Sequence, residues 1–138
     1  MAKRSYEHHG HTKYIMRYHI IFSTKFRKKL LNSIRDDILG SFKRAEDMQN
    51  DWSIELVDID KIKDDHIHIL LRGTPNTRIS EVVHKLKQIS TYDMYQQNYD
   101  YMTKFYWKQH LLWTRGYFCS TIGEVSEETL KNYIKNQG

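Results

Sequence analysis

The sequence contains few of the residues that cross-link or interrupt a chain: one cysteine, one proline and six glycines among 138 residues. The single Cys119 excludes an internal disulfide and is typical of a reducing compartment, so we expect the cytoplasm. No apolar run approaches the ~18 residues that define a membrane-spanning helix. The basic start, Met1–Ser5, is not followed by the apolar stretch of a signal peptide. We therefore expect no membrane association.

The composition favours one folded domain. Hydrophobic residues make up 39% and aromatic residues 13% of the chain, which is typical of a globule with an apolar core. The sequence shows no internal repeat and no low-complexity linker, so residues 1–138 are expected to form a single domain. The polar segment 1–12, with its clustered histidines, is expected to be a flexible arm.

Positive charge exceeds negative charge, because 22 Lys and Arg residues oppose 17 Asp and Glu residues for a formal net charge of +5. A basic single domain favours a polyanionic partner, most often nucleic acid. The charge alone does not decide this, because many basic proteins bind no nucleic acid.

Hydrophobic periodicity predicts alternating strands and helices. Residues 13–24 alternate like a strand, with His19 on the opposite face from Tyr18 and Ile20. The expected elements are a strand at 13–24, a helix at 31–50, strands at 52–60 and 66–72, a helix from 79 into the nineties, a strand at 113–122 and a last helix at 126–138. The aromatic-rich stretch 92–113 is hard to assign. This order is that of the ferredoxin-like (RRM-like) split βαβ fold, an α+β class with an antiparallel sheet and helices on one face.

Two histidines on the third expected strand are the first candidates for chemistry. Alternate side chains of a strand share a face, so His66 and His68 project to the same side, roughly 7 Å apart at ~3.3 Å per residue. Two imidazoles so placed can converge on one metal ion. The apolar residues between them would pack under the helices, which leaves the histidines on the open face, within reach of a substrate. The alternative is a pair of surface histidines with no role.

The last expected helix carries the second candidate. Tyr133 and Gln137 are four residues apart and share a helix face, while Leu130 and Ile134 can pack the helix on the domain. A tyrosine hydroxyl is a weak nucleophile at neutral pH, but it can attack phosphorus when a metal polarises the phosphate. The alternative is an amphipathic aromatic that covers the helix interface.

Four runs together resemble one family. They are Tyr18–Phe22, Asp65–Leu70 with its His-Ile-His triplet, Leu112–Phe118, and Leu130–Gln137 with a tyrosine followed four residues later by glutamine. In this order they resemble the single-tyrosine HUH transposases of small insertion sequences that move as single-stranded DNA, which have the REP-associated tyrosine transposases as relatives. The resemblance spans Thr12 to Gln137, nearly the whole chain.

The resemblance implies a mechanism and partners. His66, His68 and Gln137 would bind a divalent metal, Mg²⁺ or Mn²⁺, and Tyr133 would be the catalytic nucleophile of the helix at 126–138. Its attack on single-stranded DNA would leave a 5′-phosphotyrosine link and a free 3′-hydroxyl, and another 3′-hydroxyl would rejoin the strands. No nucleotide cofactor is implied. Members of the family are homodimers that recognise hairpin ends of single-stranded DNA.

Basic and aromatic side chains could contact that DNA. Lysines and arginines are candidate phosphate contacts, although a solvated surface is the simpler role for any one of them. Aromatic side chains between 92 and 107 could stack unpaired bases, although most should pack against the sheet or a partner. The candidate phosphate contacts are Lys25, Arg27, Lys28, Lys29, Arg78 and Lys85, with Lys87 beside them.

Three alternatives remain open at this point. A non-enzymatic single-strand binder of the same fold would carry stacking aromatics on the strand where His66 and His68 stand. A metallohydrolase would need further ligands, and Asp65 should face away from His66 in a regular strand. A domesticated transposase would keep the chemistry but act on chromosomal palindromic repeats.

Overall fold

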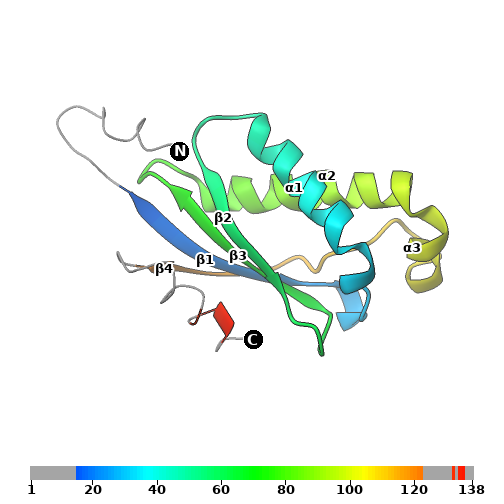
Figure 1. Ribbon diagram of the computed structural model, residues 1–138. Helices are drawn as coiled ribbons and strands as arrows, with labels where there is room; N and C mark the ends of the chain where they lie inside the picture. Colours follow the sequence, from blue (N-terminus) through cyan, green and yellow to red (C-terminus); the bar gives the residue numbers. More distant parts are fainter. Residues whose placement is uncertain (1–14, 123–131, 133, 136–138) are drawn as a thin grey trace.

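The computed structural model describes residues 15–122, 132 and 134–135 (Figure 1). The expected arm at 1–12 lies outside the described residues, as does most of the expected last helix, of which Asn132, Ile134 and Lys135 are helical. The elements are strands β1 (Met16–Ser23), β2 (Ser53–Ile59), β3 (His66–Gly73) and β4 (Phe118–Ile122), helices α1 (Arg35–Asp47), α2 (Ile79–Gln97) and α3 (Tyr99–Phe105), and the short 3₁₀ turns η2 (Lys25–Arg27) and η3 (Asn32–Ile34).

The four strands form one antiparallel sheet in the order β2-β3-β1-β4. This is the arrangement that the order of the sequence elements predicted, and the α+β, ferredoxin-like class is confirmed. In the β1–β3 register, Ser23 lies opposite His66 and Ile21 opposite His68. The end of β1 and the start of β3 therefore lie side by side at one end of the sheet.

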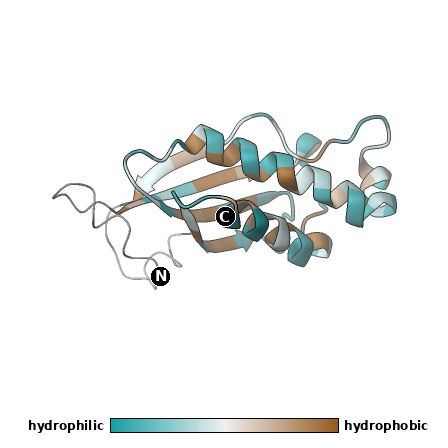
Figure 2. Ribbon diagram, turned by 90° about the horizontal axis from the view of Figure 1, so that it is seen from above, coloured by the Kyte–Doolittle hydropathy of each residue, from teal (hydrophilic) through white to brown (hydrophobic). Residues whose placement is uncertain are grey.

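Alternation along the strands separates the two faces of the sheet. Ile67, Ile69 and Leu71 are each 0% exposed and face α1 and α2, as predicted. Figure 1 shows both helices on one side of the sheet, and Figure 2 shows their ribbons changing between teal and brown along their length, as expected of helices with one apolar side. The fully buried members of this core include Ile20, Leu30, Leu31, Ile38, Phe42, Leu86, Met94 and Met102.

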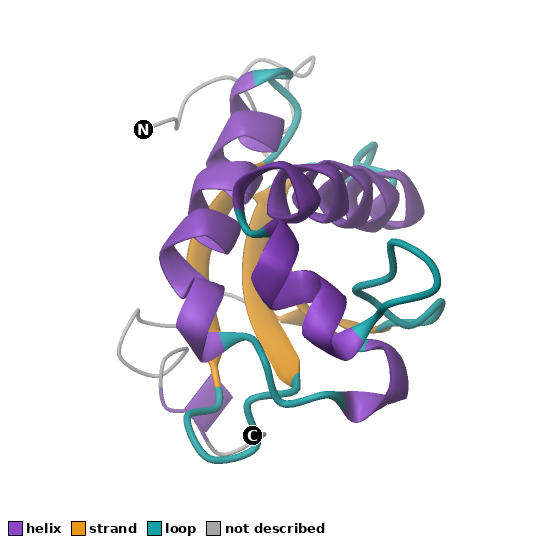
Figure 3. Ribbon diagram, turned by 90° about the vertical axis from the view of Figure 1, so that its right-hand side faces the viewer, coloured by secondary structure: helices purple, strands orange, loops and turns teal. Residues whose placement is uncertain are grey.

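The aromatic-rich stretch that the sequence left unassigned contains the end of α2 and all of α3, which lies at the right of Figure 1 and faces the viewer in Figure 3. Three of its tyrosines pack inward and donate hydrogen bonds to distant backbone carbonyls. Tyr101 donates to Leu30, and Tyr106 donates to Lys25, each at 2.7 Å. Their role is to fasten loops to the core, as expected of packing aromatics, whereas Tyr92, Tyr99 and Trp107 are exposed.

The expected strand at 113–122 was too long, because β4 begins only at Phe118. Trp113 makes an isolated bridge with Thr24 instead. The three carbonyls that follow, from Thr114 to Gly116, accept hydrogen bonds at 2.7, 3.0 and 2.9 Å from the ammonium of Lys87 on α2. A lysine has three donors, so Lys87 is fully used within the fold and is withdrawn as a phosphate contact.

None of the helices in the described part of the chain is long and apolar enough to cross a membrane.

Candidate functional site

The two histidines of the sequence motif open β3 on the face of the sheet opposite α1 and α2. Their ring centroids lie 5.1 Å apart, so they do project to the same side. They are not open to solvent, however, because His66 is 7% and His68 only 1% exposed. The expectation of an open surface was wrong here, since side chains from neighbouring elements cover this face.

His19 of β1 is a third imidazole in the same cluster. Its Nε2 and the Nδ1 of His68 are hydrogen-bonded at 2.9 Å, and the two rings are stacked with centroids 5.2 Å apart and planes at 13°. His19 was not among the site residues that the sequence predicted. The signal was present, because His19 alternates away from Tyr18 and Ile20, and pairing of β1 with β3 brings that face beside His68.

His66 is held from the other side by a carboxylate. Its Nδ1 is hydrogen-bonded to Oδ1 of Asp65 at 2.9 Å, and Arg27 Nε donates to Oδ2 of the same carboxylate at 3.0 Å. The expectation that Asp65 faces away from His66 was therefore wrong. Asp65 lies before β3 begins and follows Asp64, whose φ of 58° turns the chain out of regular strand geometry.

Burial lowers the pKa of two of the imidazoles. It lowers the pKa of His68 to about 4, with further lowering by the charges of His66 and His19, and it lowers the pKa of His19 as well. Burial also raises the pKa of the Asp65 carboxyl, but hydrogen bonds from His66 and Arg27 outweigh it and hold that pKa below its usual range. At neutral pH His19 and His68 are thus uncharged beside an ionised carboxylate, and a neutral imidazole is the form that metal ligation requires.

The donor atoms fit a divalent metal. Nδ1 of each motif histidine is already occupied, and Nε2 of His68 is buried without a hydrogen-bond partner among the described residues. A buried nitrogen left in that state costs about 1–3 kcal/mol, which a metal bond would offset. In the part of the chain that the structure describes, no group of three or more His, Cys, Asp and Glu side chains could hold a metal. The expected third ligand, Gln137, and the expected nucleophile, Tyr133, lie outside the described residues.

The C-terminal segment contacts this same face. Ile134 is 1% exposed and packs with Leu70 of β3, flanked by Leu56 and Ile122, in a cluster separate from the main core. Figure 1 shows the described C-terminal residues (red) on the opposite side of the sheet from α1 and α2. Ile134 therefore has the packing role that the sequence predicted for it.

The candidate phosphate contacts divide into two groups. Lys25, Arg27, Lys28 and Lys29 follow the end of β1, beside the start of β3, and Arg27 reaches Asp65 directly while its side chain stays 60% exposed. Arg78 and Lys85 lie at the start of α2, in the helical layer, where Arg78 forms an exposed ion pair with Glu81. The structure brings the first group to the histidines and not the second.

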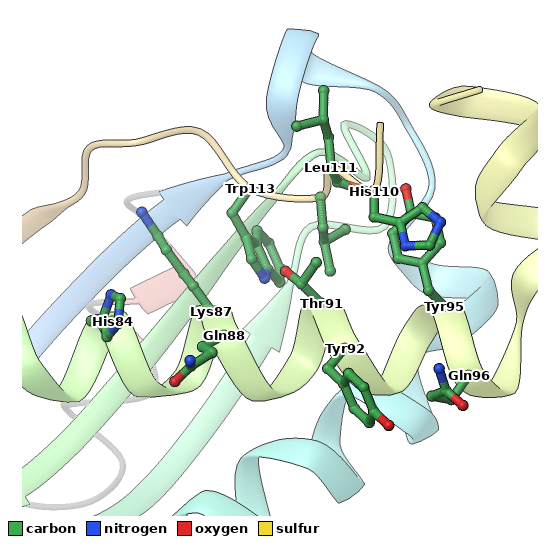
Figure 4. Close-up of a pocket in the computed structure, with 11 residues that line it drawn as sticks. His84, Lys87, Gln88, Thr91, Tyr92, Tyr95, Gln96, His110, Leu111 and Trp113 are labelled. Atoms are coloured by element: carbon green, nitrogen blue, oxygen red, sulfur yellow. Dashed lines mark hydrogen bonds between the residues drawn. The ribbon is translucent and has the colours of Figure 1, made fainter. Parts of the chain in front are cut away.

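A cavity of about 530 Å³ lies between α2 and the segment 110–113 (Figure 4). The rings of Tyr95 and His110 stack at one end of it, with centroids 4.1 Å apart, and Trp113 donates a hydrogen bond to Ser90 beside it. The cavity belongs to the helical side of the sheet, and neither His66 nor His68 lines it. It is therefore separate from the histidine cluster.

Comparison with known proteins gives consistent matches over nearly the whole chain. Residues 12–137 match the family model described as "Transposase IS200 like". The transposase for insertion sequence element IS200 of Salmonella typhimurium is 30% identical over 129 residues, which cover 93% of this chain and 80% of that protein. The ISDra2 transposase TnpA of Deinococcus radiodurans is 29% identical over 124 residues, covering 90% and 85%.

Solved structures show the same architecture. The crystal structure of a chain described as a transposase from Deinococcus radiodurans superposes with a TM-score of 0.71 at 25% identity, covering 99% of this chain and 98% of that one. A REP-associated tyrosine transposase, solved bound to a REP hairpin, superposes with a TM-score of 0.58 at 11% identity over 88% of this chain and 61% of that one. At that identity the second match concerns the fold alone.

Proposed function

The chain belongs to the IS200-like transposase family, and from that premise we propose that it cleaves and rejoins single-stranded DNA at transposon ends in a metal-dependent reaction. The observation that carries the proposal is the imidazole pair on β3. His66 and His68 are buried, adjacent and each occupied at Nδ1, which directs both Nε2 atoms to other partners.

His66 and His68, with Gln137, would hold the divalent cation, Mg²⁺ or Mn²⁺. Imidazole nitrogen is a common ligand for Mn²⁺ and an unusual one for Mg²⁺, which prefers oxygen. Once bound, such a cation supplies electrophilic polarisation of the scissile phosphate. The protein's own contribution is to hold the buried imidazoles in a fixed orientation before a cation binds, because Asp65 and His19 are hydrogen-bonded to them.

Tyr133 is the proposed nucleophile. Its hydroxyl oxygen bonds to the scissile phosphorus and loses its proton, and the bond from phosphorus to the 3′ oxygen of the preceding nucleotide breaks. The products are a 5′-phosphotyrosine and a free 3′-hydroxyl, and a second 3′-hydroxyl reverses the exchange to join new ends. No nucleotide cofactor is consumed, since one phosphodiester bond replaces another. The contact that supports this role is that of Ile134, the next residue in the sequence, with the histidine face.

The proposed substrate is single-stranded DNA with hairpin ends, and the proposed assembly is a homodimer in the cytoplasm. The net charge of +5 and the basic segment Lys25–Lys29 beside the site support a DNA strand on the histidine face. The hairpin belongs to the proposal by analogy with the REP-associated relative, whose structure contains one.

The test is covalent trapping on single-stranded DNA taken from the flanks of the chain's own gene. The protein is incubated with labelled strands and Mn²⁺ or Mg²⁺, then resolved on a denaturing gel beside Tyr133→Phe and His66→Ala. A slowly migrating, denaturant-resistant band that is absent from both variants and from EDTA-treated samples is expected. Cleavage without such a band, undiminished in Tyr133→Phe, would replace this mechanism with water-mediated hydrolysis. Retention on a native gel with no cleavage of any flank would indicate a binding module.

A further inference from the structure

The hydrogen bond between His19 and His68 can be made in two ways, and only one of them leaves His68 able to bind a metal. A neutral imidazole carries one proton, on Nδ1 or on Nε2. If His19 Nε2 donates, His68 carries its proton on Nε2. If His68 Nδ1 donates, the lone pair of His68 is on Nε2.

The metal role proposed for His68 separates the two cases, because a cation can bind only a lone pair on its Nε2. This atom is buried and has no hydrogen-bond acceptor among the described residues. A proton on it would be a buried donor without a partner, whereas a lone pair there is what a metal ion takes. His66 provides the comparison, because an ionised carboxylate such as Asp65 can only accept. His66 Nδ1 must therefore be the donor, with the lone pair on Nε2.

We propose that His19 is a positioning residue of the metal centre: it accepts the Nδ1 proton of His68 and so holds His68 in the tautomer whose Nε2 lone pair is available to a divalent cation. This rests on the proposed function, which makes His68 a ligand. Asp65 acts in the same way on His66, so each motif histidine has its own acceptor, one a carboxylate and the other an imidazole.

The position of the His19 side chain is fixed by its surroundings. It is 0% exposed, it stacks on the ring of His68, and the ring of Phe118 meets it edge-on with centroids 6.3 Å apart. Its strand, β1, is hydrogen-bonded on both sides, to β3 and to β4. The acceptor nitrogen therefore stays 2.9 Å from His68 by packing, and metal binding is not needed to place it.

The test uses the full chain, isotope-labelled and freed of metal, near neutral pH. Long-range proton–nitrogen correlation NMR reports which ring nitrogen of each histidine carries the proton. We expect His68 protonated on Nδ1, with unprotonated Nε2 atoms on both His19 and His68. A wild-type spectrum with His68 protonated on Nε2 would overturn the proposal outright.

Two variants and one control extend the test. His19→Phe keeps a ring and removes the acceptor, so His68 should shift toward the Nε2-protonated form and Mn²⁺ affinity by calorimetry should fall about 10–100-fold. His19→Gln offers an amide oxygen in place of the ring nitrogen and should recover most of both signals. Tyr18→Phe removes a hydroxyl from the adjacent residue on the core face and should change neither. Equal Mn²⁺ affinity for wild type and a folded His19→Phe would contradict the proposal.

These readouts are independent of the chemistry proposed above. The tautomer is measured without metal or DNA, so it can hold even if the Tyr133 adduct is never found. In that case the transposition mechanism fails and the positioning role of His19 stands. Conversely, a Tyr133-dependent adduct with an Nε2-protonated His68 keeps the mechanism and removes His19 from it.

Discussion

Ile134 is buried against Leu70, the residue that follows His68 by two positions on β3 and shares its face. The contact lies in a small apolar cluster of its own, on the other side of the sheet from the main core. Among the described residues, Ile134 attaches the C-terminal segment to the histidine face through Leu70, Leu56 and Ile122. Its attachment should respond to a single substitution that leaves the rest of the fold intact.

Replacing Ile134 with aspartate should release that segment. Burial of an isoleucine side chain contributes about 1.5–3 kcal/mol, and a carboxylate cannot take its place beside Leu70. We expect the yield of the covalent DNA adduct to fall at least about tenfold, because ~1.4 kcal/mol is a factor of ten. Ile62→Asp is the matched control, since Ile62 is 86% exposed and should tolerate the change. An undiminished adduct in Ile134→Asp would show that this docking is not required.

Lys87→Met should destabilise the fold through the loop that precedes β4. The variant keeps the length of the side chain but removes the donor to three successive carbonyls and the cation 5.2 Å from the ring centroid of Phe22. We expect a loss of about 1–2 kcal/mol in the free energy of unfolding, measured by urea denaturation. Lys85→Met, at an exposed position of the same helix, should stay within about 0.5 kcal/mol. Equal effects of the two variants would rule out this role for the Lys87 ammonium.

Asp65→Asn should weaken metal binding without removing a ligand. The amide keeps the size of the side chain but lacks the charge that favours the Nδ1 proton of His66 and pairs with Arg27. Mn²⁺ affinity by calorimetry should fall about tenfold or more. Asp47→Asn changes the same charge at an exposed position of α1, in the helical layer, and should leave the affinity as it was. If both variants bind Mn²⁺ like the wild type, Asp65 has no part in the site.

The salt dependence of DNA binding should distinguish the two groups of cations. Each phosphate contact on single-stranded DNA adds about 0.7 to the slope of log affinity against log salt. Lys29 lies in the segment beside the histidines and Lys85 in the helical layer, and both are exposed. We expect Lys29→Gln to lower the slope by about one contact and Lys85→Gln to change it less. The opposite ranking would place the DNA strand over the helical layer.

Lowering the pH should decrease the free energy of unfolding of the metal-free protein before the carboxylates are protonated. The unfolded chain protonates His68 near its ordinary pKa of 6.5, whereas the folded protein does so only near about 4. Between those values the unfolded state binds more protons, so stability is fully present above pH 6.5 and is lost as the pH falls toward 4. Urea titrations in EDTA should show this slope. It should shrink in His68→Gln and persist in His84→Gln, where an exposed histidine is replaced.

The fold could be predicted from the sequence wherever a pattern was local. Alternation gave the strands at β1 and β3, and three-to-four spacing gave α1 and α2. The sequence failed where a distant side chain decides the backbone. Nothing local in Thr114–Gly116 shows that Lys87 will bind its carbonyls, and the break between α2 and α3 falls at Asn98, whose side chain donates to Asp37 of α1.

The candidate site divides in the same way. The spacing of His66 and His68 placed them on one face, since alternation is a property of one strand. His19 and the inward turn of Asp65 depend on strand pairing and on a left-handed residue at Asp64, which one strand does not reveal. The roles of Tyr133 and Gln137 stay predictions that the adduct experiment addresses.

The strict alternation of β3 also predicts which positions change first in a gene copy that is no longer selected for transposition. Its odd and even positions serve different ends, because Ile67, Ile69 and Leu71 build the core while His66 and His68 occupy the other face. Buried imidazoles without a metal are a cost to folding, so drift toward apolar residues there should be neutral or stabilising. Selection for a stable fold therefore does not conserve His66 and His68. A copy that accumulates mutations would lose its activity well before it loses its fold. Old insertions should therefore encode stable but inactive proteins.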